Sequence, residues 1–468
     1  MDISQDIYLT GNPQITFFKV IYRRHTNFSM ESIEQTFNGS ADWGKKVTCT
    51  VSRNGDLIHR AYLRVQLPDV TIQPNTAFRW LNWVGHVMIK TIELEIGGQR
   101  IDKHYGDWLH IWNELTQSAG HQLGYANMVG NIPSLVQPYV NSSSSNTVKL
   151  DGEILYIPLE FWFNRNPGLA LPLIALQYHE VKINLELRNA NECFWTNSVS
   201  GGVVSTAYNT IDTTKVSVPS LGQCSLFVDY IYLDTDERRR FAQVSHEYLI
   251  EQLQFTGDES TSNTNNKVKL NFNHPCKELI WVVQPDANVT DANTSAVYGK
   301  QWFNYSDALD YTYVSSTDAS GGAFANSNVS LVEPSGERNA GSMPGVAAGG
   351  ANNVYVPVSF ENGKNPVKLC KLQLNGHDRF SERDGRYFNL VQSYQHHENV
   401  PSVGINVYSF ALKPEEHQPS GTCNFSRIDN ATLQLTLTPT STSGGNTAKI
   451  RVNKLAYARK SHPEKGIG

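Results

Sequence analysis

Apolar and polar residues alternate in many short runs along this chain, and this pattern limits its fold more than any other feature. Successive side chains of an extended strand point to opposite faces, so each run predicts a strand that is buried on one face. Turn residues separate the runs and long helical periodicity is rare, which favours β-sandwiches over alternating strands and helices. The clearest runs are 46–51, 61–67, 91–96, 181–187, 226–233, 267–272, 368–374 and 432–437.

Two segments are predicted to be short helices. The segment 234–244 has an acidic first turn, which the dipole of a helix favours, and it follows a strand at mid-chain. A length of 468 residues suits two domains of roughly 200 residues each, so we interpret this helix as the domain junction. The other helix is expected around 105–117, and its apolar face consists of Trp108, Ile111, Trp112 and Leu115.

The two halves of the chain repeat one order of elements. The segments 90–100 (KTIELEIGGQR) and 368–378 (KLCKLQLNGHD) share a basic start, alternating Leu or Ile and a turn glycine. An aromatic strand follows later in each half, at 159–163 and 407–412, and a Pro-containing loop comes after it. This repetition indicates an all-β chain that arose by duplication of a single sandwich.

Composition excludes several classes of function. The formal net charge is −5, from 39 basic and 44 acidic residues, which gives no overall field that would attract nucleic acid. Six cysteines are scattered singly, so we expect reduced, mostly buried thiols and intracellular folding. No stretch approaches the roughly 18 apolar residues of a membrane span, and no signal peptide is expected.

The motifs that resemble catalytic sites are all incomplete. The segment 39–46 (GSADWGKK) begins like a phosphate-binding loop but ends in Lys where Ser or Thr is needed, and a strand is predicted after it. The His-Glu pairs at His179 and His246 lack the second histidine of a zinc-protease helix. Glu382 and Asp384 lie among arginines and are interpreted as ion pairs. We therefore expect no catalytic residue, no cofactor and no small-molecule substrate.

A histidine-rich cluster leaves two interpretations open. His396, His397, Glu398 and His417 are close in sequence, and a β fold that brought the three imidazoles together would hold zinc in a cupin-like way. No carboxylate completes a recognised spacing, so hydrogen-bonded loop histidines are the simpler interpretation and no metal site is predicted. The alternative function is accordingly a β-sandwich glycan-binding protein or a cupin-type metalloenzyme.

The amino-terminal segment combines an apolar run with a basic cluster before the first clear strand. It is either an ordinary first strand or an arm that docks on a neighbouring subunit or an internal layer. A second unusual segment, 306–353, contains too few large apolar residues to build a core layer and is expected to be an exposed loop. The candidate contact residues of the arm are Phe17, Phe18, Lys19, Arg23, Arg24 and His25.

Several long blocks of the sequence are distinctive. They begin with GNPQITFFKVIYRRHTNFSME and NRNPGLALPLIALQYHEVKI in the first half and LDTDERRRFAQVSHEYLIEQLQ at the junction. HPCKELIWVVQ and a long run that includes GHDRFSERDGRYFNLVQSYQHHENV follow in the second half. The blocks lie at 11–31, 164–183, 233–254, 274–284 and 374–435 and thus run through both halves. Together they resemble the major capsid protein of the nucleocytoplasmic large DNA viruses, a double jelly-roll family.

The resemblance implies two consecutive eight-stranded antiparallel jelly-roll β-sandwiches with short helices in the connecting loops. It further implies a structural protein, not an enzyme, whose homotrimers form pseudo-hexagonal capsomers that tile an icosahedral shell. The implied partners are neighbouring capsomers, minor capsid proteins and the internal membrane beneath the shell. By this analogy the protein belongs to the virion and is made and assembled in the host cytoplasm, with the arm facing inward and 306–353 in the outward crown.

The expected domain organisation follows from these patterns together. One departure from the family concerns the carboxyl terminus, which reads KLAYARKSHPEKGIG where family members commonly end in a Gly/Met-rich segment finishing in LAYSN. We expect an arm at 1–24, a first jelly roll at 25–235, a linker helix at 236–244, a second jelly roll at 245–457 with its crown loop at 306–353, and a tail at 458–468.

Overall fold

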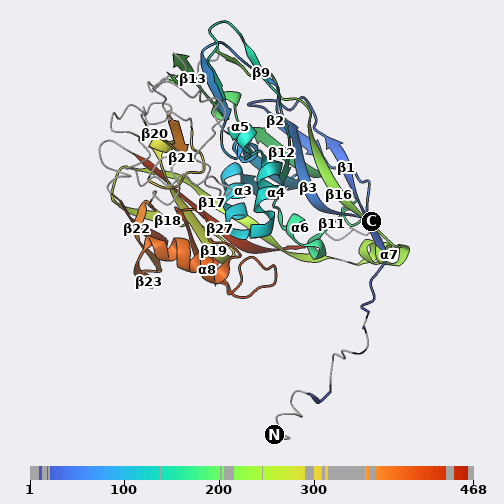
Figure 1. Ribbon diagram of the computed structural model, residues 1–468. Coiled ribbons are helices and arrows are strands. Elements are labelled where there is room, and N and C mark those ends of the chain that lie inside the picture. The colour runs from blue at the N-terminus through green and yellow to red at the C-terminus, as the bar shows by residue number, and fades with distance from the viewer. Residues whose placement is uncertain are drawn as a thin grey trace.

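The computed structural model shows two β-sandwiches joined side by side, with helices between them and at their edges (Figure 1). The residues that it describes are 10–12, 18, 20, 22–136, 139–200, 203–204, 215–244, 246–289, 300–307, 311–314, 354–357, 364–438 and 447–461.

Two antiparallel sheets form the first sandwich. One sheet has the order β1-β16-β3-β10, with β11 (Leu171–Pro172) paired to the start of β3, and the other has the order β2-β12-β6-β7. The first sheet consists of β1 (Phe28–Thr36), β16 (Cys224–Leu233), β3 (Leu57–Gln66) and β10 (Ile154–Pro158). The second consists of β2 (Lys46–Thr50), β12 (Val181–Leu187), β6 (Ile89–Ile96) and β7 (Gln99–Tyr105).

The second sandwich has the same construction. Its sheets have the orders β17-β27-β19-β24 and β18-β26-β22-β23, and β25 (Cys423–Asn424) pairs with the start of β19. The first sheet consists of β17 (Glu247–Thr261), β27 (Ala448–Ser461), β19 (Pro275–Pro285) and β24 (Ile405–Ser409). The second consists of β18 (Asn265–Lys269), β26 (Ala431–Leu437), β22 (Val367–Leu374) and β23 (His377–Asp384).

Both sandwiches are jelly rolls, because their eight principal strands are connected identically. When these strands are numbered one to eight along each half, one sheet has the order 1-8-3-6 and the other 2-7-4-5 in both halves. This double Greek-key wrapping defines the jelly roll. The structure therefore confirms the predicted all-β fold with two consecutive eight-stranded antiparallel jelly rolls.

The connecting loops carry the remaining elements. Three small sheets have the orders β14-β13-β5-β8, β15-β4-β9 and β20-β21. Their strands are β4 (Val70–Ile72), β5 (Thr76–Trp80), β8 (Tyr139–Asn141), β9 (Val148–Leu150), β13 (Phe194–Ser200), β14 (Val203–Val204), β15 (Val216–Ser217), β20 (Tyr311–Val314) and β21 (Val354–Pro357). The α-helices are α2 (Val84–Met88), α3 (Gly106–Thr116), α4 (Gln122–Val129), α5 (Pro133–Val136), α6 (Trp162–Arg165), α7 (Thr235–Gln243) and α8 (Gln392–His396).

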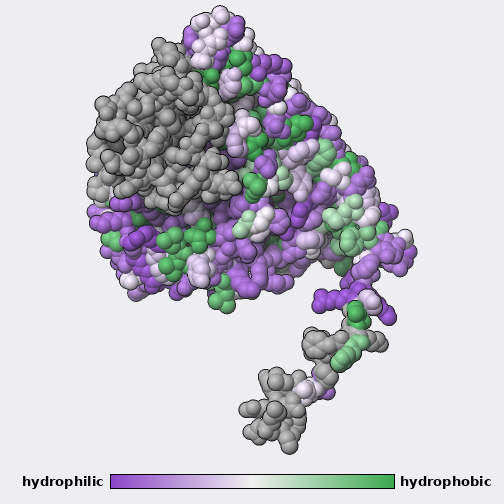
Figure 2. Space-filling view, viewed as in Figure 1, coloured by the Kyte–Doolittle hydropathy of each residue, from purple (hydrophilic) through white to green (hydrophobic). Residues whose placement is uncertain are grey.

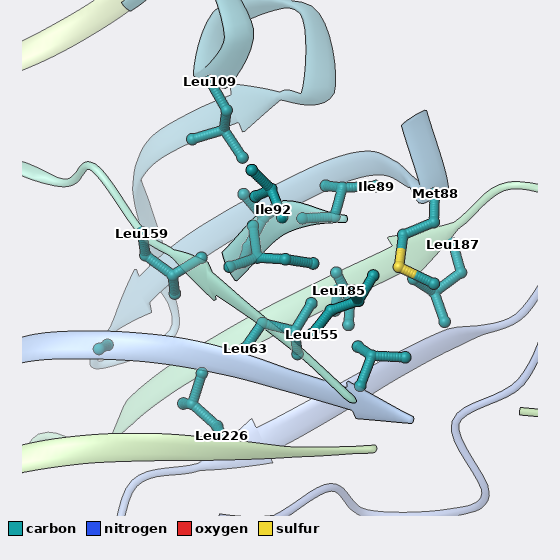
Figure 3. Packing of buried hydrophobic residues seen from close by; sticks show 14 of the residues in the cluster. Leu63, Met88, Ile89, Ile92, Leu109, Leu155, Leu159, Leu185, Leu187 and Leu226 are labelled. Carbon is teal, nitrogen blue, oxygen red and sulfur yellow. The ribbon is translucent and has the colours of Figure 1, made fainter. Parts of the chain in front are cut away.

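Each sandwich encloses its own apolar core. In β12 and β26 every second residue is buried, as the alternating sequence requires. Figure 3 shows how leucines from both sheets of the first sandwich meet, with Leu63, Leu155 and Leu226 facing Leu185. Full burial of one such side chain contributes about 1.5–3 kcal/mol to folding, so the periodicity of the sequence translates directly into core stability.

The structure confirms the predicted strands and helices with few exceptions. Every alternating run named above overlaps a strand, although β18 ends at Lys269 and leaves the second half of the run 267–272 outside it. The two predicted helices are α3 and α7. The prediction of an aromatic strand at 159–163 is wrong, because β10 ends at Pro158 and helix α6 begins at Trp162. Phe161, Trp162 and Phe163 are all buried, so this segment is covered on every side and does not alternate. All six cysteines are free thiols and four of them are buried.

Three further expectations concern His179, the carboxyl-terminal tail and the crown segment. His179 lies in a turn before β12, not in a strand. The last strand, β27, continues through Ser461, so the segment expected as a tail from residue 458 begins as strand. In the expected crown segment, residues 308–310 and 315–353 lie outside the described residues, and Tyr311–Val314 forms strand β20, which pairs with β21.

The repeated hairpins noticed in the sequence occupy equivalent places. β6 and β7 are joined through Gly97 and Gly98, with φ of 57° and 79°, and β22 and β23 through Asn375 and Gly376, with φ of 51° and 81°. Two-residue loops with both φ values positive are type I′ turns, which match the twist of the strands and favour Gly and Asn. Both hairpins connect strands four and five of their jelly roll.

A glycine also begins the helix that follows strand five in each half. A Cβ atom at Gly106 would collide with the carbonyl oxygen of His86, and one at Gly385 with that of Val367. In both halves the obstacle is backbone close to the start of strand four. Only glycine lets the helix begin this close to the strand.

We predict that Gly385→Ala lowers the free energy of unfolding by about 1–3 kcal/mol, because the added methyl group forces backbone apart. Gly120→Ala is the matched control, since no atom lies within 4 Å of a Cβ there. Urea denaturation of both variants measures the difference. Equal stabilities would show that the helix start adjusts without cost.

Candidate functional site

The two sandwiches meet at a joint, which contains the largest apolar cluster outside their two cores among the described residues. Helix α3 belongs to the first sandwich, but one of its faces is buried against the outer face of the β17-β27-β19-β24 sheet. The joint therefore buries an apolar surface that neither sandwich could cover alone. It consists of Trp108, Ile111, Trp112 and Leu115 from α3 and Leu253, Ile280, Val282, Tyr305, Ile405, Val407 and Leu455 from the second half.

Arg451 closes one side of the joint. Its Nη1 atom lies 2.6 Å from Asp107 Oδ2 at the start of α3, and its Nε atom donates to Asp258 Oδ1 at 2.8 Å. Burial by itself lowers the pKa of Arg451, but the carboxylates, Asp107 foremost, outweigh burial and raise it. The guanidinium therefore stays charged and ties the helix start to the second sandwich.

Glu251 occupies the centre of a second charged group in the joint. Its carboxylate accepts hydrogen bonds from Arg165 Nη1 at 2.8 Å and Lys277 Nζ at 2.7 Å, and His417 Nδ1 lies 3.6 Å away. Burial alone would raise the pKa of Glu251, but His417, Arg165 and Lys277 outweigh it and lower the pKa to about 2. The Arg165 guanidinium also stacks on the Trp112 ring at 4.1 Å, which links this group to the apolar part of the joint.

The structure does not bring the histidine cluster together. His397 is enclosed by two carboxylates, with Nδ1 2.9 Å from Glu415 Oε1 and Nε2 2.9 Å from Glu278 Oε2. His396 bonds the carbonyl oxygen of Leu412 instead, and His417 faces Glu251. Each imidazole thus has its own partner. Among the described residues, no group of three or more His, Cys, Asp or Glu side chains is arranged to hold a metal ion.

His397 couples stability to pH. Burial lowers its pKa, but the charges and hydrogen bonds of Glu278 and Glu415 outweigh burial and raise the pKa from 6.5 to about 9. A raised folded-state pKa means that the stabilisation is fully present below pH 6.5 and is lost as the pH rises through about 9.

The free energy of unfolding of the wild type should fall by about 3 kcal/mol as the pH rises from 6.5 to above about 9. We predict that His397→Gln abolishes this fall. The measurement is the difference between the urea-derived stability profiles of the wild type and the variant from pH 6 to pH 10. His377→Gln, at an exposed histidine, is the control and should reproduce the wild-type slope. A His397→Gln profile parallel to the wild type would show that His397 does not titrate with folding.

The candidate arm has no regular secondary structure where it is described. Residues 22–27 carry no strand or helix, and the first strand begins at Phe28. Phe18 is 99% exposed and Tyr22 85%, and Arg23, Arg24 and His25 are exposed as well. Figure 1 shows this segment leading away from both sandwiches. The interpretation as an ordinary first strand is therefore wrong for residues 22–27.

Two candidate contact residues, Phe17 and Lys19, lie outside the described residues. The role of the arm as a docking segment stays a prediction. In the described part of the chain, no helix combines the length and the apolar character needed to cross a membrane.

The incomplete catalytic motifs have ordinary structural roles. The segment 39–46 leads into strand β2 and not into a helix, and Lys46 Nζ lies 3.4 Å from Glu93 Oε2. Asp384 Oδ1 lies 3.6 Å from Arg386 Nε at the end of strand β23. Neither place assembles a nucleophile with a base.

Comparison with known proteins gives this architecture its context. Residues 16–234 match the family described as major capsid protein N-terminus, and residues 237–461 match the family described as large eukaryotic DNA virus major capsid protein. The chain is 53% identical to the major capsid protein of Phaeocystis pouchetii virus, over 97% of this chain and 95% of that protein. It is 41% identical to the major capsid protein of Paramecium bursaria Chlorella virus 1, over 92% and 85%.

Solved structures agree with the sequence relatives. The quasi-atomic model of the PBCV-1 virus capsid covers 95% of this chain and 97% of its own, with a TM-score of 0.64 and 34% identity. The Faustovirus major capsid protein shares the fold, with a TM-score of 0.70 at 13% identity. The matched families and the relatives thus make this chain a structural double jelly-roll capsid protein and not an enzyme. The chain belongs to the family of major capsid proteins of large eukaryotic DNA viruses.

Sequence reasoning missed the polar part of the joint. Asp107 and Arg451 are separated by 344 positions, and Arg165 and Glu251 by 86. No spacing rule connects residues this far apart. The apolar face predicted at 105–117, which includes two tryptophans, is a signal for the apolar part of the joint but not for its charged pairs.

Proposed function

We propose that three copies of this capsid protein associate into a pseudo-hexagonal capsomer and that many capsomers tile an icosahedral shell. The supporting observation is the identical strand order of the two jelly rolls. Three chains supply six similar units, so a threefold assembly fits a lattice with hexagonal packing, and closed symmetry repeats each contact. Neighbouring capsomers, minor capsid proteins and the internal membrane are the proposed partners, with assembly in the host cytoplasm.

The proposed division of labour along the chain follows the expected domains. The arm at 1–24 faces the inside of the shell, the jelly rolls at 25–235 and 245–457 form the wall, and the helix at 236–244 links them. Basic residues close to an exposed apolar run suit contact with acidic partners or lipid headgroups. The loop at 306–353 contributes to the outer crown.

The trimer is tested by mass. Purified full-length protein should have three times the 52.3 kDa mass of one chain in light scattering at micromolar concentration. A stable monomer under these conditions would contradict the proposal.

We predict that deletion of residues 1–24 leaves folded trimers that no longer assemble into shells, because the described residues of the arm are exposed and lie outside both cores. A milder variant, Arg23→Glu with Arg24→Glu, should weaken assembly in the same direction. Arg239→Glu with Arg240→Glu, an exposed basic pair on α7, is the control that should assemble normally. Light scattering follows the trimer and electron microscopy follows the shells. Loss of the trimer itself would assign the arm to subunit folding.

A further inference from the structure

The helices that follow strand five in the two halves are equivalent elements. In the second half, helical turns begin at Gly385, continue through a π-helical segment (Tyr387–Val391) and end in α8. Both helices start at the constrained glycine described above, Gly106 and Gly385. The fourth residue of each, Leu109 and Phe388, is buried in the core of its own sandwich, as Figure 3 shows for Leu109.

Residues at the same distance from Gly106 and Gly385 occupy corresponding positions in the two helices. Ile111, Trp112 and Leu115 of α3 correspond to Leu390, Val391 and Tyr394. The first three are at most 4% exposed because the second sandwich covers them, whereas the latter three are 45%, 39% and 81% exposed. We call Leu390, Val391 and Tyr394 the helix patch.

The helix patch is an exposed apolar surface. The corresponding residues of α3 form the apolar contact between the two sandwiches. Figure 2 shows apolar residues gathered over the part of the surface where α8 lies in Figure 1. Contiguous exposed apolar residues commonly mark a surface that another molecule covers. Within the chain the equivalent surface is covered by a sheet, which indicates what kind of surface fits it.

The corresponding sheet face in the first sandwich carries aromatic side chains that are partly exposed. Helix α3 packs on the outer face of the 1-8-3-6 sheet of the second sandwich. In the first sandwich the outer face of that sheet carries Tyr62, Tyr156 and Phe227, which alternate with residues of the core. The rings of Tyr156 and Phe227 meet edge to face at 6.1 Å, and Tyr156 is 39% exposed. We call these three residues the aromatic face.

We propose that the helix patch of one copy docks on the aromatic face of a second copy, which repeats between chains the contact that joins the two sandwiches within a chain. This inference rests on the proposed trimer and names its contact surfaces. The contact is heterologous, head to tail, and such contacts close into rings when the rotation allows. The aromatic face suits exposure before assembly, because tyrosine is amphipathic and is enriched at protein interfaces.

The first test places charge in the helix patch. Leu390→Asp with Tyr394→Asp should reduce the mass in light scattering threefold, from trimer to monomer, with the circular dichroism spectrum unchanged. Leu123→Asp, at an apolar residue of α4 that is 73% exposed, is the matched control and should remain a trimer. A variant that stays trimeric would overturn the docking contact but leave the trimer intact. A monomeric wild type would instead overturn the proposed function.

The second test uses native-like protein and does not depend on a destabilised variant. Tyr394→Cys and Tyr156→Cys proteins are mixed, allowed to assemble and treated with a short bismaleimide. A covalent two-chain product should form in the mixture and exceed by at least tenfold the background of each variant alone and of the wild type. A mixture that gives only background from intact trimers would overturn the docking contact.

Discussion

The burial of one helix face against a foreign sheet is the contact on which the shape of this chain depends. Each jelly roll encloses its own core, but nothing in those cores fixes how the two are placed relative to each other. The outer face of α3 does so, because Trp108, Ile111 and Trp112 would otherwise be left in water. Each large side chain buried there favours the joined arrangement by about 1.5–3 kcal/mol. The two jelly rolls are therefore held in a fixed relative position.

Charged groups at the edge of the joint fix the position of the helix along the sheet. Hydrophobic burial is not directional, and it would tolerate sliding of the helix on the sheet. Arg451 between Asp107 and Asp258, and Glu251 between Arg165 and Lys277, require particular pairs of atoms to meet. Of these pairs, only Asp107–Arg451 and Arg165–Glu251 cross the joint, and their side chains are largely buried, so sliding of the helix would break charge-assisted contacts that water replaces poorly. The joint is therefore fixed in register as well as in position.

Duplication explains how a building block for a hexagonal lattice is encoded in one chain. Each half keeps the strand order, the type I′ hairpin and the glycine at the start of the following helix. The halves differ where their surroundings differ. The first helix meets its sheet within the chain through an apolar face, whereas the second helix and the first sheet carry tyrosines that remain compatible with water. This division is expected if one contact is permanent and the other forms on assembly.

Local sequence patterns determined most of the secondary structure of this protein. The alternating runs gave strands and the wide apolar face of 105–117 gave α3, because both depend on periodicities of 2 and about 3.6 residues that neighbouring positions reveal. The pattern failed at 159–163, where burial on every side removes the alternation from which a strand is recognised. The family blocks supplied the jelly-roll connections that periodicity alone leaves open. Only the tertiary structure decided that α3 leaves its own domain, which charges meet at the joint and that the histidines are separate, because these contacts join residues that are distant in the chain and follow no spacing rule.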